Sequence, residues 1–141
     1  MEHYESHEVD ADLLMGSLER DHDRIEDYIA VLDLVLEEGE HDARGFDDAL
    51  AVLADELQIH FRREEAWMRR AAYPGMGPHS EQHEMLLEAL GDFRRGYQSN
   101  PSRPNALVVR SFIDDWLVDH MTHADRVIEA FVRCRTGLAV G

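Results

Sequence analysis

The sequence predicts an all-α protein, an antiparallel up-down-up-down four-helix bundle with a short N-terminal arm. Helix-breaking residues cluster at three places, residues 39–45, 74–78 and 99–104, and these breaks divide the chain into four long segments. No segment alternates between apolar and polar residues with a period of two, so we expect no sheet. Short connections place consecutive helices side by side in opposite directions, which gives a bundle.

Most of the expected helices have a recognisable start or stop signal. Gly39 is a suitable C-terminal stop for the first helix. Pro78 suits the first turn of the third helix, and Pro104 comes just before the fourth. Residues 1–9 are expected to form the polar arm, and the helices are expected near residues 10–38, 43–72, 78–98 and 105–135.

Composition indicates one globular domain, residues 1–141, with a strongly acidic surface. Hydrophobic residues make up 44% of the chain, and 30 Asp and Glu against 14 Lys and Arg give a net charge of −16. Such a charge repels phosphate backbones and anionic lipids, so we expect neither nucleic acid nor a membrane surface as a partner.

The ends and the cysteine content favour a cytoplasmic protein. No apolar run approaches the roughly 20 residues that span a bilayer, and the first residues are acidic, unlike a signal peptide. The single cysteine, Cys134, cannot form an internal disulfide, and we expect it to be a small core residue.

Polar side chains interrupt the apolar stripe of every predicted helix. Steps of three and four define one inward face on each helix. Six polar residues fall on these faces: His22, His60, Glu64, His79, His83 and His120. An isolated buried histidine is most often a hydrogen-bonded core residue, but here all four helices contribute. Burying so many polar groups is costly unless one partner satisfies them together, and a metal ion can do so.

The spacing of these residues indicates two metal ions rather than one. His60 and Glu64 form one i,i+4 pair, and His79 and His83 form another, so each pair points in one direction. With Asp125, the set holds five imidazoles and two carboxylates, too many for one tetrahedral zinc ion. Nitrogen and oxygen ligands without a thiolate suit iron, and manganese or zinc less specifically, so the ligands alone leave the metal open.

Asp125 fits this set only if the fourth helix is irregular. Five residues at about 100° each place it roughly 140° around a regular helix from His120. We expect one π-type turn between His120 and Asp125, which would return the carboxylate to the inward face. The alternative is an Asp125 at the surface of a regular helix.

In order and spacing, His22, His60-x3-Glu64, His79-x3-His83 and His120-x4-Asp125 resemble the hemerythrin family, in particular its single-domain bacterial members. The residues around them are also similar, with Phe61, Glu65, Met68 and Tyr73-Pro74 in the middle of the chain and Trp116-Leu117 before His120. The resemblance covers about residues 12–133. The arm lacks the tryptophan-containing entry of many members.

The resemblance implies a non-haem di-iron centre, two Fe2+/Fe3+ ions with an oxo or hydroxo bridge. One iron would take His79, His83 and His120 and be coordinatively full. The other would take His22 and His60 and keep an open position, while Glu64 and Asp125 bridge. Leu117 corresponds to a family position that shields bound O2. Trp116 and Trp67 are expected to wall this pocket, or else to be ordinary core aromatics.

The resemblance implies reversible O2 binding, for carriage, storage or delivery, rather than catalysis. The alternatives on the same ligands are a di-iron enzyme with peroxidase, oxidase or nitric-oxide chemistry, and an O2 or iron sensor. An enzyme would use an extra proton donor, for which His123 is the candidate, and a sensor would carry an output domain. Dioxygen is the expected partner, with nitric oxide or a reductant as alternatives, and the oligomeric state is open.

Four other polar residues are expected outside the ligand set. His3 and His7 lie in the arm, and His41 lies in the first connection, where we expect it to be solvated. Glu65 points about 100° away from Glu64, so we expect it at the surface or beside a ligand.

Overall fold

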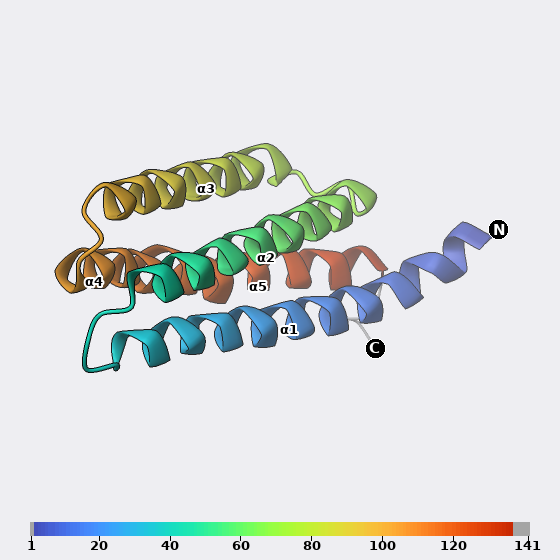
Figure 1. Cartoon of the computed structure of the whole chain (residues 1–141). Helices are drawn as coiled ribbons and strands as arrows, with labels where there is room; N and C mark the ends of the chain where they lie inside the picture. Colours follow the sequence, from blue (N-terminus) through green and yellow to red (C-terminus); the bar gives the residue numbers. More distant parts are fainter. Residues whose placement is uncertain (1, 137–141) are drawn as a thin grey trace.

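A computed structural model describes the backbone of residues 2–136 and the side chains of residues 16–134 except that of Asp125. Figure 1 shows long helices packed side by side, and each helix runs against the direction of the one before it. The elements are α1 (Glu2–Leu36), α2 (Ala43–Arg70), α3 (Met76–Ser99), α4 (Arg103–Phe112), η1 (Ile113–Val118) and α5 (Asp119–Thr136). Because α4, η1 and α5 follow one another without a break, they form one continuous fourth helix, and the predicted all-α four-helix bundle is confirmed.

Short polar side chains and one strained residue set the helix ends. The Gly45 amide donates to the Asp42 carboxylate at 2.9 Å and so caps the start of α2. Ser102 caps α4 in the same way. Beyond the end of α2, Ala72 has φ 53°, a left-handed conformation that turns the chain toward α3.

The fourth helix contains a π-helical segment, but not where we expected it. The segment is η1, which precedes His120, whereas residues 119–136 form a regular α-helix. The expected π turn between His120 and Asp125 is therefore wrong in position. Ile113 and Leu117 of this segment and Met121 just after it are buried, so the π-helical turn lies against the core.

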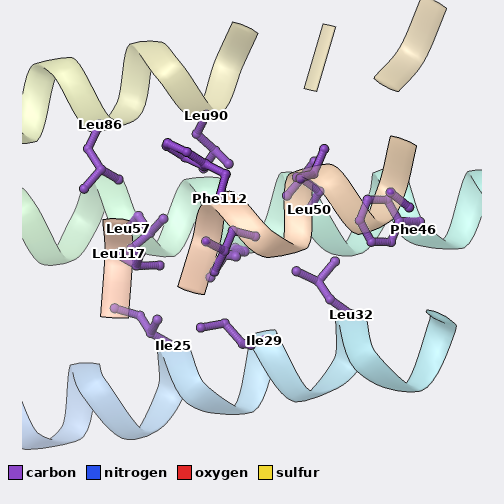
Figure 2. Close-up of a cluster of buried hydrophobic side chains, with 14 of the residues drawn as sticks. Ile25, Ile29, Leu32, Phe46, Leu50, Leu57, Leu86, Leu90, Phe112 and Leu117 are labelled. Atoms are coloured by element: carbon purple, nitrogen blue, oxygen red, sulfur yellow. The ribbon is translucent and has the colours of Figure 1, made fainter. Parts of the chain in front are cut away.

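The apolar core has two parts. Figure 2 shows residues of the larger cluster, to which α1 contributes Ile25 and Leu32, α2 Leu57, α3 Leu90 and η1 Leu117. The smaller cluster consists of Leu18, Met68, Ile128 and Val132. Along α2 the polar residues His60 and Glu64 lie between Leu57 and Met68, and along α1 His22 lies between Leu18 and Ile25. The polar residues thus occupy a layer between the two clusters.

Two further expectations are corrected. Residues 2–9, expected as a separate polar arm, form the first turns of α1, which extends past its neighbours in Figure 1. Cys134 is exposed, so the expected core role is wrong. Among the described residues, no helix is both long enough and apolar enough to cross a membrane.

Candidate metal centre

Four side chains from three helices converge on one point in the polar layer. Glu64 of α2, His79 and His83 of α3 and His120 of α5 each offer one ligand atom, and these atoms lie within 4.8 Å of one another. Glu64, His79 and His83 are buried. His120 is only partly buried as a residue, but its Nε2 atom is shielded from solvent. The structure thus brings together four of the seven predicted ligands as one group.

The Glu64 carboxylate faces two separate groups of imidazoles. Its Oε1 atom lies 2.6 Å from His79 Nε2 and 2.8 Å from His83 Nε2. Its Oε2 atom lies 3.8 Å from His60 Nε2. The His22 ring packs edge-on against the His60 ring at 5.3 Å between centroids. One oxygen therefore points toward the α3 histidines and the other toward His60 and His22.

The three imidazoles around Oε1 are close enough to share a ligand. The centroid distances are 4.5 Å for His79 and His83, 4.9 Å for His79 and His120, and 5.0 Å for His83 and His120. The i,i+4 spacing places His79 and His83 one turn apart on the inward face of α3. Phe61 supports them, because its ring stacks on His83 at 4.0 Å and meets His120 edge-on.

The hydrogen bonds around His83 show that a cation fits this group. Each of its ring nitrogens lies beside a carboxylate, Nε2 at 2.8 Å from Glu64 and Nδ1 at 2.7 Å from Glu65. A neutral imidazole carries one proton and can donate to only one of them. A metal ion bound by Nε2 and the Glu64 carboxylate would leave the proton for Glu65 and would offset the buried negative charge. Glu65 therefore lies beside His83, a predicted ligand, which is one of the two positions we expected for it.

A fully buried carboxylate, that of Asp21, lies beside the imidazole pair formed by His22 and His60. Asp21 has 0% exposure, and its Oδ2 atom accepts from His60 Nδ1 at 3.1 Å, while Arg63 pairs with Oδ1. Burial raises the pKa of Asp21, but the bond to His60 and the charges of His60, Arg63 and Arg24 outweigh burial, so the pKa lies below its ordinary value.

Sequence reasoning missed Asp21, although a signal was present. Asp21 follows Leu18 by three residues and precedes Ile25 by four, so it lies on the inward face of α1 together with its neighbour His22.

The three expected pocket residues lie in different surroundings. Leu117 is buried in the larger cluster. Trp116 is 60% exposed and lines a cavity of about 630 Å3 that also reaches His120. Trp67 packs against the smaller cluster, with the Arg70 guanidinium 5.2 Å from its ring centroid. Their assignment to an O2 pocket stays a prediction.

The remaining candidates are placed as follows. The side chains of Asp125, His3 and His7 lie outside the described residues, so the bridging role of Asp125 stays a prediction. His123 is exposed and lies 3.1 Å from the Asp119 carboxylate. His41 is partly buried, with Nε2 2.6 Å from the Tyr97 hydroxyl, so the expected solvated position is wrong.

Comparisons with known proteins agree with this geometry. The family model described as hemerythrin HHE cation binding domain matches residues 14–132. A bacteriohemerythrin of Methylococcus capsulatus is 28% identical over 55% of this chain, and the match spans 59% of that protein's length. A bacteriohemerythrin of Ralstonia nicotianae is 24% identical over 77% of this chain and 76% of its own. Myohemerythrin-1 of Phascolopsis gouldii is 32% identical over 52% of this chain and 55% of its own. Since the family model covers most of the sequence, the chain belongs to the hemerythrin family.

Proposed function

We propose that this chain is a single hemerythrin domain that binds O2 reversibly at two iron ions. One ion would be held by His79, His83 and His120 and the other by His22 and His60, with the carboxylate of Glu64 shared between them. The resemblance implies Asp125 as a second shared carboxylate, although the regular α5 turns this position roughly 140° around the helix axis from His120. Family membership and a ligand set without thiolates support iron. When bound, the two ions would supply the electrons that reversible O2 binding requires.

The observation that carries the proposal is the placement of the Glu64 carboxylate. It is fully buried, and its two oxygens are directed toward the three imidazoles on one side and the two on the other. A carboxylate so placed can serve two ions at once. Because three imidazoles would serve one ion and two the other, the ion held by His22 and His60 would be the one able to take a diatomic ligand.

Apolar side chains of this chain border part of the site. Phe61 is nearly fully buried and stacks on His83, Leu117 is nearly fully buried in the larger cluster, and Leu57 is completely buried one turn before His60. Apolar walls exclude water and stray protons from the site, and so protect the bound gas from irreversible chemistry. This environment favours a carrier or storage protein.

The position of the larger cavity also favours O2 binding over catalysis. The cavity of about 630 Å3 lies between α3 and the fourth helix and reaches His120. An organic reductant held there would contact the side with three imidazoles and would lie away from the proposed open position. The enzyme alternative therefore ranks below O2 carriage.

The test is a spectroscopic O2-binding experiment on the iron-loaded protein. The reduced protein is loaded with iron, O2 is added, and the visible spectrum is recorded before and after sparging with argon. We expect about two irons per chain and a visible band that argon removes. His22→Asn should abolish the band, whereas His123→Asn, which changes an exposed histidine of α5, should keep it. Iron content far below two per chain, or a change that argon does not reverse, would contradict the proposal.

Leu117→Ala tests the shielding role predicted for this side chain. Removing a side chain with 1% exposure opens space beside the site, so we expect autoxidation of the oxygenated protein to be several times faster. The rate is followed by the decay of the visible band. Leu107→Ala, at a position of α4 with 49% exposure, is the control and should leave the rate unchanged. An unchanged rate in Leu117→Ala would assign Leu117 to packing alone.

A further inference from the structure

We propose that Asp21 is a positioning residue that, together with Arg63, fixes the tautomer of His60 so that its Nε2 atom is available to the second metal ion. The inference rests on the proposed two-ion centre. Asp21 would hold His60 in place rather than bind an ion itself, and Arg63 would hold Asp21.

The contacts around His60 determine which ring nitrogen carries the proton. Asp21 and His60 both have 0% exposure, and Nδ1 lies 3.1 Å from Asp21 Oδ2. An ionised carboxylate only accepts hydrogen bonds, so the proton of a neutral His60 must be on Nδ1. Nε2 is then unprotonated and faces the Glu64 Oε2 atom at 3.8 Å. Two atoms that each lie about 2.0–2.2 Å from one ion can be this far apart.

Arg63 fixes the orientation of this chain of hydrogen bonds. Its guanidinium only donates, and it pairs with Oδ1, the Asp21 oxygen that His60 does not use. The Arg63 side chain is 44% exposed, so the hydrogen bonds lead from the surface at Arg63 through the buried Asp21 carboxylate to the His60 imidazole. In Asp21→Asn, Arg63 would take the amide oxygen and the amide NH2 group would turn toward His60. His60 Nδ1 would then have to accept, and the proton would move to Nε2, the atom that must bind the metal.

The second carboxylate–histidine pair lacks this constraint and provides a matched control. Glu65 Oε2 lies 2.7 Å from His83 Nδ1, and the Glu65 side chain is 27% exposed. No Arg or Lys pairs with Glu65 among the residues that the structure describes. In Glu65→Gln the amide can rotate to present its oxygen to His83, so the tautomer of His83 is kept. The isosteric change from acid to amide should therefore move the imidazole proton of His60 when it is made at position 21, and should leave the proton of His83 in place when it is made at position 65.

The tautomer is measured directly by 15N NMR of the imidazoles in the metal-free protein, at a pH at which His60 is neutral. The His60 signals are assigned by their loss in His60→Asn. We expect the proton on Nδ1 in the wild type, on Nε2 in Asp21→Asn, and again on Nδ1 in the double variant Asp21→Asn/Arg63→Met, where the amide is released to turn. A wild-type His60 with its proton on Nε2 would overturn the proposal even if the variants failed to fold.

Zinc titration then links the tautomer to metal binding. We expect the wild type to bind two ions and Asp21→Asn to bind the second ion about 10–100-fold more weakly. Asp21→Asn/Arg63→Met should recover most of this loss, and Glu65→Gln should lose less than Asp21→Asn. Equal affinities in wild type and Asp21→Asn, or no recovery in the double variant, would overturn the inference. A wild type that binds fewer than two ions would instead contradict the proposed function, while the NMR result would still decide the tautomer.

Discussion

Replacing the central carboxylate by its amide, Glu64→Gln, should remove one of the two metal ions. Glu64 Oε1 contacts the Nε2 atoms of His79 and His83, and Oε2 faces His60. Glutamine has the same shape but only one oxygen, and its NH2 group cannot bind a metal. Whichever way the amide turns, one of the two positions loses its shared oxygen.

The size of the effect follows from ligand-linked stability. A site that binds only the folded state contributes about 2.7 kcal/mol when the free ion is at 100 times its dissociation constant. Two such sites contribute about 5.4 kcal/mol, which raises the Tm of a chain near this length by roughly 10–20 °C. With one site lost, Glu64→Gln should show at most about half of this rise.

Thermal unfolding with and without zinc measures the rise in Tm for the wild type and for Glu64→Gln. Zinc is used because it has no redox chemistry. The metal-free variants are compared first, so that the change on adding zinc is separated from any direct effect on folding. Glu65→Gln, the same chemical change one residue later, should keep most of the wild-type rise. If Glu64→Gln gained as many degrees from zinc as the wild type, Glu64 would not be shared between two ions.

Three further predictions concern stability. Arg94 donates two hydrogen bonds to Asp47, at 2.9 and 3.1 Å, and these bonds lower the pKa of Asp47 in the folded protein. The pair therefore stabilises the folded protein fully at pH values above about 3.9, the pKa of an Asp in the unfolded chain. Its contribution to the free energy of unfolding is lost as the pH falls through the lower folded-state pKa. Asp47→Asn should cost up to about 1 kcal/mol at pH 7 and progressively less below pH 4 in urea unfolding, and a cost that did not change with pH would contradict the assignment. Ala72→Gly should raise the free energy of unfolding by about 0.5–1 kcal/mol, because glycine adopts the φ of 53° without strain; a loss of stability would refute the strain. Leu57→Ala, at 0% exposure, should cost about 2–5 kcal/mol, whereas Leu34→Ala, at 64% exposure, should cost under about 0.5 kcal/mol, and equal costs would contradict the described core.

Local sequence signals were sufficient to predict the helices and half of the site. Gly39, Pro74 and Gly75 lie between helices, so the bundle could be predicted without knowing its packing. The i,i+4 spacing of His79 and His83 likewise determines which way both side chains point on α3. These features depend only on the geometry of a single helix.

Features that depend on packing between helices could not be placed from the sequence. Ile113 and Leu117 of the π-helical segment are buried against the other helices, and this packing is a property of the assembled bundle. The spacing of Asp21 from Leu18 and Ile25 indicates an inward position, but its hydrogen-bond partner, His60, lies on the neighbouring helix and could not be identified from α1 alone. His41 likewise finds its hydrogen bond with Tyr97, 56 residues away in the sequence.

A crystal structure of the iron-loaded protein, with anomalous difference maps at the iron edge, would test the central claim most directly. We predict two peaks, one on each side of the Glu64 carboxylate, with His79, His83 and His120 around one peak and His22 and His60 around the other. A single peak, or two peaks that share no carboxylate, would contradict the account.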